Sequence, residues 1–385
     1  MVEGILSGLR VIEVSAFVAA PLAGATLASI GADVIRVEQL GGGVDAKRWP
    51  VHDGRSLYRA GLDRGKRSLA LDLRSARGQD LVSDLIVAPG PDAGILVTNL
   101  PARSWMAYER LAARRPDLVM VVIGGTPDGR PAVDYTVNAG AGFPWITGPE
   151  GWTGPVNHVL PAWDVATGLL TVTAVLAADR HRRRTGRGQL VQLALSDVAL
   201  AVTGHLGFLA EAQLNEVPRG RFGNDLYGSY ATDFRTADGA HVMVCALTGR
   251  QWKSLVEATG LAAEFRALEQ RQGIDLNEEG ERFAHRREIS ALLEPWFADR
   301  TLEEVRQQLE AHDVLWGPYR TFKEWVRDDP RAAAPAASPL VFASFGRPPE
   351  PPGPEIGSDT ETVLRDVLGL DSEAVAVLRA QGVIG

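Results

Sequence analysis

Cysteine is nearly absent from this sequence of 385 residues, which contains only Cys245. A single cysteine excludes an intrachain disulfide framework and any cysteine-rich zinc site, and it suits a reducing cytoplasm. Cys245 follows the apolar segment "HVMV" in an expected strand. This setting favours a core thiol over a nucleophile.

The sequence also lacks the usual nucleotide and hydrolase motifs. The first expected strand is followed by "SAFVAAP" rather than G-x-G-x-x-G, although Glu38 stands where an acid could meet a ribose. No phosphate-loop motif and no G-x-S-x-G motif occurs. His158, His181 and His205 do not have metal-ligand spacing. We therefore expect no nicotinamide cofactor and no bound metal.

The sequence also has no excess of positive charge, because 48 acidic residues outnumber 40 Lys and Arg residues, which gives a net charge of −8 and an isoelectric point of about 5.5. This balance argues against wholesale nucleic-acid binding but leaves room for a local anion pocket. Residues 14–32 carry no charge, which raises the question of a membrane span. Pro21, Gly24 and Gly31 divide this run into a strand, a turn and a helix, so we expect no membrane association.

Hydrophobic patterning predicts an α/β fold with a doubly wound, Rossmann-like sheet. Strands are expected at "LRVIEVSAF", "DVIRVEQ", "RSLALDL", "AGILVTNL" and "DLVMVVIGG", with helices between them. A strong helix is expected over 166–183, after "PAWD". The chain exceeds the usual size of one core. Because the composition changes near residue 217, where glycine, asparagine and aromatic residues become frequent, we expect a smaller α+β domain at about 225–320.

Basic residues occur near several expected strand ends, namely Arg36, Lys66, Arg67 and Arg103. Ligands of open α/β sheets bind outside the carboxyl ends of the strands. Each residue alone is compatible with solvated surface charge. Together they predict a site for an anionic phosphate ligand.

Several segments resemble the class III (CaiB/BaiF) CoA-transferases, and the likeness covers nearly the whole chain in order. They include "LSGLRVIEVSAFVAAPLAGATLASIGADVIRVEQLGGG", "GKRSLALDL", "ILVTNLPAR", "DYTVNAGAGFPWITG" and "PAWDVATG". The resemblance implies a large Rossmann-like domain built from both chain ends (1–215 and 325–385) around a small domain (225–320). It also implies an interlocked homodimer. No permanently bound cofactor is implied, since coenzyme A arrives as part of the acyl-CoA substrate.

The resemblance also assigns residues. It makes Asp164 the nucleophile, and its CoA-contacting positions fall on Arg36, Lys66, Arg67, Asn99, Leu100 and Arg103. Family racemases carry a histidine where this chain has Val133, and oxalate-specific members carry a glutamine where it has Val18. Both activities are therefore disfavoured.

Other segments, such as "GGGVDAKRWPV" and "VNHVLPAWD", resemble members that move CoA between the two carboxyls of mesaconate. The alternative is transfer between two molecules, from an acyl-CoA donor such as succinyl-CoA to a related dicarboxylate.

Asp164 is the only charged residue of "PAWDVATGLL". Read without the resemblance, it is equally compatible with a nucleophile or a helix cap. The amides of the helix expected from Ala166 would then keep its carboxylate ionised.

Four further residues are candidates around the substrate. Arg48 is the candidate cation for the spare carboxylate of the substrate, with a surface role as the alternative. Asp134 and Asn138 either border the pocket or make structural hydrogen bonds. His158 is expected to be a positioned loop residue.

Overall fold

The computed structural model describes residues 4–333, 338–346 and 351–385. The described chain divides into two compact units. The first contains the N-terminal part up to Ala141, Val159–Leu214 and the C-terminal segment. The second contains Gly142–His158 and Asn215–Ala333. The segment Gly142–His158, which was expected in the larger domain, belongs to the second unit in this structure.

The first unit is built on a six-stranded sheet in the order β5-β2-β1-β6-β7-β8, with every neighbouring pair parallel. The predicted parallel α/β fold is confirmed. Its strands are β1 (Arg10–Val14), β2 (Asp33–Gln39), β5 (Arg67–Leu71), β6 (Ile95–Thr98), β7 (Val119–Gly124) and β8 (Gln189–Ala194).

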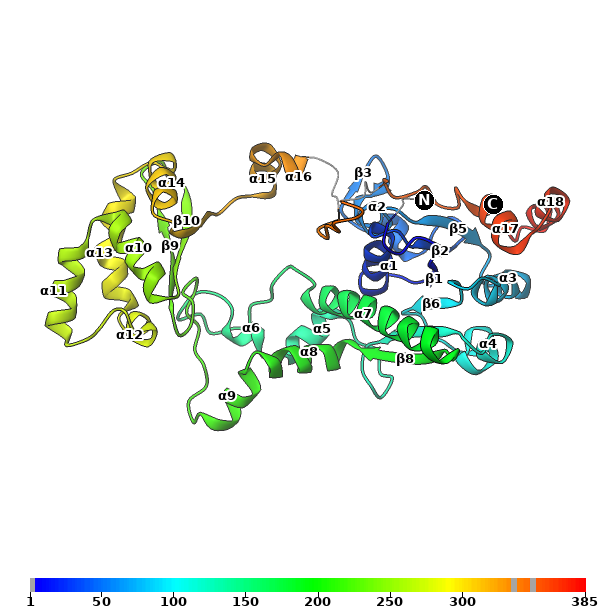
Figure 1. Ribbon diagram of the computed structural model, residues 1–385, viewed down its shortest axis with the longest axis horizontal. Coiled ribbons are helices and arrows are strands. Elements are labelled where there is room, and N and C mark those ends of the chain that lie inside the picture. The colour runs from blue at the N-terminus through cyan, green and yellow to red at the C-terminus, as the bar shows by residue number, and fades with distance from the viewer. Residues whose placement is uncertain (1–3, 334–337, 347–350) are drawn as a thin grey trace. The chain divides into compact units, whose positions relative to one another are not determined.

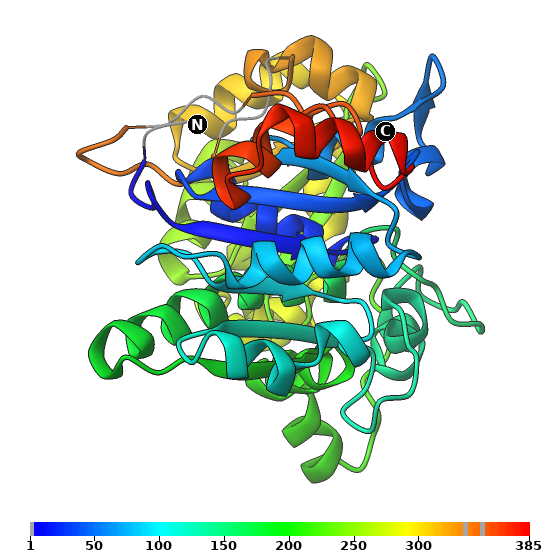
Figure 2. The same cartoon turned by 90° about the vertical axis from the view of Figure 1, so that its right-hand side faces the viewer.

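Alternate residues of these strands enter two different hydrophobic cores, as a sheet covered on both faces requires. Val11 belongs to the core formed with helices α1, α7 and α8 (Figure 1). Ile12 belongs to the core formed with α3, α4, α17 and α18, the side that faces the viewer in Figure 2. The helices are α1 (Ala19–Ser29), α3 (Ala76–Val87), α4 (Tyr108–Arg114), α7 (Ala162–Thr185), α8 (Leu195–His205), α17 (Thr360–Leu368) and α18 (Ser372–Ala380).

Short elements complete the first unit around the ends of the strands. They are the 3-10 turns η1 (Val44–Lys47) and η2 (Ser104–Met106), the hairpin β3 (Val51–His52) and β4 (Arg55–Ser56), and the helices α2 (Leu57–Leu62), α5 (Asp134–Gly140) and α9 (Phe208–Leu214). The segment after α18 returns to the sheet, where Ile384 forms a bridge with Leu71 and Val383 accepts a hydrogen bond from the backbone of Asp72. Residues late in the chain thus cover the edge strand β5.

The second unit has its own core around a three-stranded antiparallel sheet in the order β11-β10-β9. Arg221, 9% exposed, donates hydrogen bonds to the carbonyls of Pro144, Trp145 and Trp152 and so ties the segment 142–158 to this unit. The elements are α6 (Phe143–Ile146), β9 (Tyr230–Arg235), β10 (His241–Ala246), α10 (Gly249–Thr259), α11 (Ala262–Gln272), α12 (Glu279–Ala284), α13 (Arg286–Ala298), α14 (Leu302–Ala311), β11 (Leu315–Pro318), α15 (Phe322–Asp328) and α16 (Pro330–Ala333).

Helix α7 is the one helix of the described residues that is long and apolar enough to cross a membrane by length and composition alone. In this structure it packs along α1 and also contacts β7, β8 and α8. The approach to α1 is closest at Gly168, where an added Cβ atom would lie 2.8 Å from the carbonyl oxygen of Ala19. Only glycine permits this contact between the two backbones.

We expect Gly168→Ala to destabilise the protein by about 1–3 kcal/mol, because the added methyl group forces α7 away from α1. This loss outweighs the gain of up to about 1 kcal/mol in helix propensity. Urea unfolding of the variant measures the change. Gly280→Ala is the matched control, since an added Cβ on this helical glycine meets nothing within 4 Å. Equal midpoints for the two variants would contradict the packing argument.

Candidate active site

The candidate site lies at the carboxyl edge of the parallel sheet. Loops that follow β1, β2 and β7 carry Phe17, Arg48 and Asp134, respectively. Helix α7 leads through a short turn into β8 and therefore runs antiparallel to the strands, which places its first turn at the same edge. This edge is where open α/β sheets bind ligands.

Asp164 lies inside the first turn of α7, because the helix begins at Ala162 rather than near Ala166 as expected. The N-cap position is Pro161, and no side-chain cap comes from it. The interpretation of Asp164 as a helix cap is therefore wrong. Its carboxylate projects from a residue with helical backbone geometry, while another residue binds the free amides of the turn.

That other residue is Asp134, which opens α5 and is 4% exposed. Its Oδ2 atom accepts hydrogen bonds from the backbone N–H groups of Trp163, at 2.7 Å, and Asp164, at 3.1 Å. Asn138, one turn further along α5, accepts a hydrogen bond from Nε1 of Trp163 at 3.1 Å. For Asp134 and Asn138 the structure thus shows the structural alternative, in which both residues fix the first turn of α7.

Burial and the negative charge of Asp134 together raise the pKa of Asp164 to about 6, and the positive charge of Arg48 opposes both effects. Two backbone N–H groups of this first turn, those of Trp163 and Asp164, donate to Asp134 rather than to the Asp164 carboxylate. A carboxyl group with this pKa is still mostly ionised at pH 7 and is more basic than an ordinary aspartate. Such a perturbed acid at a ligand-binding edge is typical of a functional group.

Arg48 follows η1, and its guanidinium group lies over two aromatic rings, 5.2 Å from the ring centroid of Phe17 and 4.7 Å from that of Tyr58. Cation–π contacts of this kind restrict the orientation of the guanidinium plane. The sheet edge therefore brings together Arg48, Asp134, Asn138 and Asp164, all of which were predicted as site residues. His158 belongs to the second unit, and its functional role stays a prediction.

Phe17, Asp45 and Tyr58 also belong to this environment, and sequence reasoning did not select them. Phe17 has a positive φ of 65°, and its backbone N–H donates to the carboxylate of Asp45 at 3.0 and 3.2 Å. Burial raises the pKa of Tyr58, and the charges of Asp164, Asp45 and Asp134 raise it further against the opposing effect of Arg48. No sequence signal marks Tyr58, since it lies in a short helix after an irregular segment.

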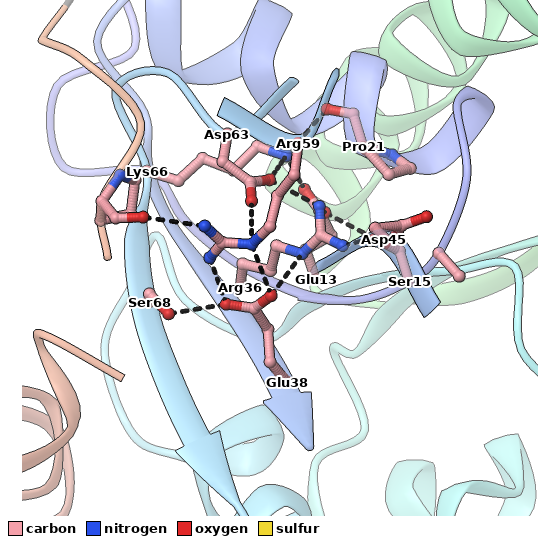
Figure 3. Close-up of polar contacts among 12 residues, drawn as sticks. Glu13, Ser15, Pro21, Arg36, Glu38, Asp45, Arg59, Asp63, Lys66 and Ser68 are labelled. Carbon is pink, nitrogen blue, oxygen red and sulfur yellow. Dashed lines mark hydrogen bonds and ion pairs between the residues drawn. The ribbon is translucent and has the colours of Figure 1, made fainter. Parts of the chain in front are cut away.

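Arg36 and Lys66, which were expected to contact CoA, are buried among carboxylates (Figure 3). Arg36 pairs with Asp63 and, at 2.9 Å, with Asp45, and the Nζ atom of Lys66 lies 2.8 Å from Glu13. We call the full set the charge cluster; it comprises Glu13, Arg36, Glu38, Asp45, Arg59, Asp63 and Lys66. These pairs give Arg36 and Lys66 a structural role in place of the expected one, because their charges already have buried partners.

The remaining expected CoA contacts fall on opposite edges of the sheet. Arg67 opens β5 at the amino edge, where it binds Asp33 at 2.6 and 2.9 Å, away from the carboxyl edge where open α/β sheets bind ligands. Asn99, Leu100 and the exposed Arg103 follow β6 at the carboxyl edge. The side-chain amide of Asn99 exchanges hydrogen bonds with both backbone groups of Ala16 and thereby joins the loops after β1 and β6.

We expect Asp164→Asn to stabilise the fold at pH 8 by about 1–2 kcal/mol, after allowance for screening of a partly exposed side chain. A pKa raised to about 6 means that the folded state favours the protonated carboxyl. The stability of the wild type relative to the variant is therefore lost as the pH rises from about 4 to 6.

Thermal unfolding between pH 3 and pH 8 measures this difference. It should be near zero at pH 3 and constant above pH 7. Asp80→Asn is the control, since Asp80 is exposed on α3. A difference between Asp164→Asn and the wild type that does not depend on pH would exclude the electrostatic explanation.

Comparison with known proteins agrees with this geometry. A family model described as CoA-transferase family III matches residues 6–338. The chain is 51% identical to a 2-methylfumaryl-CoA isomerase of Chloroflexus aurantiacus, over 99% of this chain and 98% of the relative. It is 31% identical to a succinyl-CoA:mesaconate CoA-transferase of Haloarcula hispanica, over 85% of this chain and 83% of the relative.

The fold is also similar to that of a solved structure. A CaiB/BaiF family protein from Brucella suis superimposes with a TM-score of 0.76 at 24% identity, covering 94% of this chain and 99% of the other. This similarity concerns the fold alone. Together with the family model and the near full-length relative, it confirms the resemblance noted from the sequence: the chain belongs to CoA-transferase family III.

Proposed function

We propose that the chain moves coenzyme A between the C1 and C4 carboxyls of mesaconate, which is 2-methylfumarate, with Asp164 as the covalent nucleophile. The observation that carries this proposal is the 51% identity to a 2-methylfumaryl-CoA isomerase over nearly all of both chains. The partial exposure of Asp164 and its raised pKa support its role, because a nucleophile must be reachable and basic.

The first half of the reaction transfers CoA to the enzyme. The Asp164 carboxylate attacks the C1 thioester carbonyl, and the carbon–sulfur bond breaks to give a mixed anhydride and a CoA thiolate. The thiolate attacks the aspartyl carbonyl of the anhydride and expels the C1 carboxylate. The products are an aspartyl-CoA thioester and free mesaconate.

The second half returns CoA to the other end of the acid. The C4 carboxylate attacks the aspartyl-CoA thioester, which forms a second anhydride and again releases the thiolate. The thiolate attacks the C4 carbonyl and restores the Asp164 carboxylate. No step requires a proton, which agrees with the presence of Val133 where family racemases carry a histidine base.

Free mesaconate must stay at the site between the two halves, and it carries two negative charges. Arg48 is our candidate for holding one of its carboxylates, since a guanidinium can bind a carboxylate through two hydrogen bonds. Its charge already acts on Asp164, and the rings of Phe17 and Tyr58 limit its orientation.

We also propose that coenzyme A contacts the carboxyl edge of the sheet through Asn99, Leu100 and Arg103. These residues follow β6, and the exposed guanidinium of Arg103 suits a phosphate group. CoA enters as part of the acyl-CoA substrate, and no permanent cofactor takes part in the proposed steps.

A homodimer, interlocked as the sequence resemblance implies, is part of the proposal. Helices α7 and α8 and the residue after α8 expose large apolar side chains, including Leu169, Leu200 and Leu206, the last two at 60% and 62%. Exposed apolar patches of this kind mark protein interfaces, and a second copy of the chain would cover them. We place the protein in the cytoplasm, because a single cysteine suits a reducing compartment.

The direct test is to incubate the enzyme with mesaconyl-C1-CoA as the sole substrate. We expect mesaconyl-C4-CoA to form without any added acid, and we expect Asp164→Asn to reduce the rate by at least about 10³-fold, since no carboxylate remains to accept CoA. Liquid chromatography with mass spectrometry separates the two isomers.

The alternative is transfer between two molecules, which the similarity to a succinyl-CoA:mesaconate CoA-transferase supports. Addition of isotopically labelled free mesaconate or succinate tests this alternative. The label should stay out of the CoA ester if transfer is intramolecular. A wild-type enzyme that makes no product until a second acid is added would refute the isomerase proposal.

The pKa of Asp164 predicts the pH dependence of the reaction. Only the ionised carboxylate attacks, so kcat/KM should fall as the pH drops through about 6. In Asp134→Asn the neighbouring negative charge is gone, while an amide oxygen remains to cap α7. The acidic limb of the variant should therefore move to lower pH. An unchanged limb in a folded Asp134→Asn variant would show that another group controls the profile.

A further inference from the structure

We propose that Tyr58 is a substrate-binding residue whose phenol hydroxyl donates a hydrogen bond to the carboxylate of the free dicarboxylic acid held by Arg48. This inference rests on the proposed function and adds a second, uncharged donor to the site.

The hydroxyl of Tyr58 is the first observation. Its oxygen is buried and has no hydrogen-bond partner among the described residues, although the side chain as a whole is only half-buried. Buried phenol hydroxyls are normally hydrogen-bonded, and an unpaired one costs the desolvation of a polar group. An orphan hydroxyl at a ligand-binding edge therefore indicates a partner that arrives with the substrate.

The surroundings of Tyr58 are the second observation. Its ring lies under the Arg48 guanidinium, with 4.7 Å between the ring centroid and the central carbon. Asp164, Asp134 and Asp45 act on the same phenol, and together with burial they raise its pKa, so the hydroxyl stays protonated at neutral pH. The Arg48 cation, the neutral Tyr58 hydroxyl and the proposed nucleophile Asp164 therefore belong to the same site.

The position of Tyr58 is fixed by its neighbours in the chain. Arg59, the next residue of α2, binds Glu38 through two of its nitrogens at 2.6 and 3.0 Å. Asp63, directly after α2, pairs with Arg36 and lies 3.2 Å from Arg59. Because the charge cluster holds α2 at both of these points, the phenol is held in place before substrate binds.

A neutral donor suits the proposed chemistry. Free mesaconate must turn so that its C4 carboxylate, rather than its C1 carboxylate, faces the aspartyl-CoA thioester. The site must therefore hold each carboxylate and then release it. Arg48 supplies the charge that retains the acid at the site. The hydrogen bond from Tyr58 gives direction without a second full charge, which would hold the acid in one orientation.

Tyr58→Phe is the informative variant, because it removes only the hydroxyl and keeps the ring over Arg48. We expect conversion of mesaconyl-C1-CoA to slow by about 10- to 100-fold, as for loss of a hydrogen bond to a charged group. We also expect more free mesaconate to escape per molecule of product, with little change in KM for the acyl-CoA. Mass spectrometry of free acid and both CoA esters in the same samples gives all of these values.

Tyr108→Phe is the matched control. Tyr108 is the first residue of α4 and packs against the hydrophobic core on that face of the sheet, away from the site. It should match the wild type in rate and in acid release, and circular dichroism should show all three proteins folded. A purely structural role for Tyr58 would leave the ratio of released acid to product unchanged.

Two outcomes separate this inference from the proposed function. If the wild type isomerises and Tyr58→Phe matches it in rate and acid release, the role of Tyr58 is wrong and the proposed function stands. If the wild type does not isomerise mesaconyl-C1-CoA alone, the proposed function fails, and the role of Tyr58 fails with it.

Discussion

The buried charge cluster is the constraint on which the candidate site depends. Its carboxylates and cations come from β1, β2 and the segment between β2 and β5, so it ties the chain between Leu40 and Lys66 to the centre of the sheet. That segment carries Arg48 and Tyr58. Removing one partner of a buried pair leaves an uncompensated charge, which costs about 3–5 kcal/mol. The cluster therefore stabilises one arrangement of these loops. Burial raises the pKa of Glu13, and the charges of Lys66 and Arg36 oppose this effect.

A second acid near Asp164 serves both geometry and reactivity. Asp134 accepts hydrogen bonds from two backbone amides in the first turn of α7, and its negative charge makes the Asp164 carboxylate more basic. One carboxylate thus fixes the helix turn and leaves the other dependent on Arg48 for compensation. This environment resembles the paired carboxylates of hydrolases, where unlike surroundings give two acids different roles. Here one acid is structural and the other is exposed to the ligand edge.

Sequence reasoning recovered the parts of this arrangement that are encoded locally. Alternating and continuous apolar runs predicted β1, β2, β5, β6 and β7, and the chemistry of a dicarboxylate selected Arg48. It failed where a residue's partner lies far along the chain. The pairing of Arg36 with Asp63 has no signal near Arg36 in the sequence, so the sequence predicts a ligand contact there instead. The start of α7 was placed four residues late because its cap, Asp134, comes from another helix. Tyr58 carries no local signal.

The closure of β5 by Ile384 and Val383 also sets an order of events during biosynthesis. Every segment of the second unit precedes the segment that covers β5, so the ribosome delivers the inserted unit complete while the surrounding one still lacks part of its core. Contacts between such distant segments form slowly. The apolar side of β5 therefore stays uncovered in the nascent chain until the last segment is made, and exposed apolar edges of this kind are prone to aggregation.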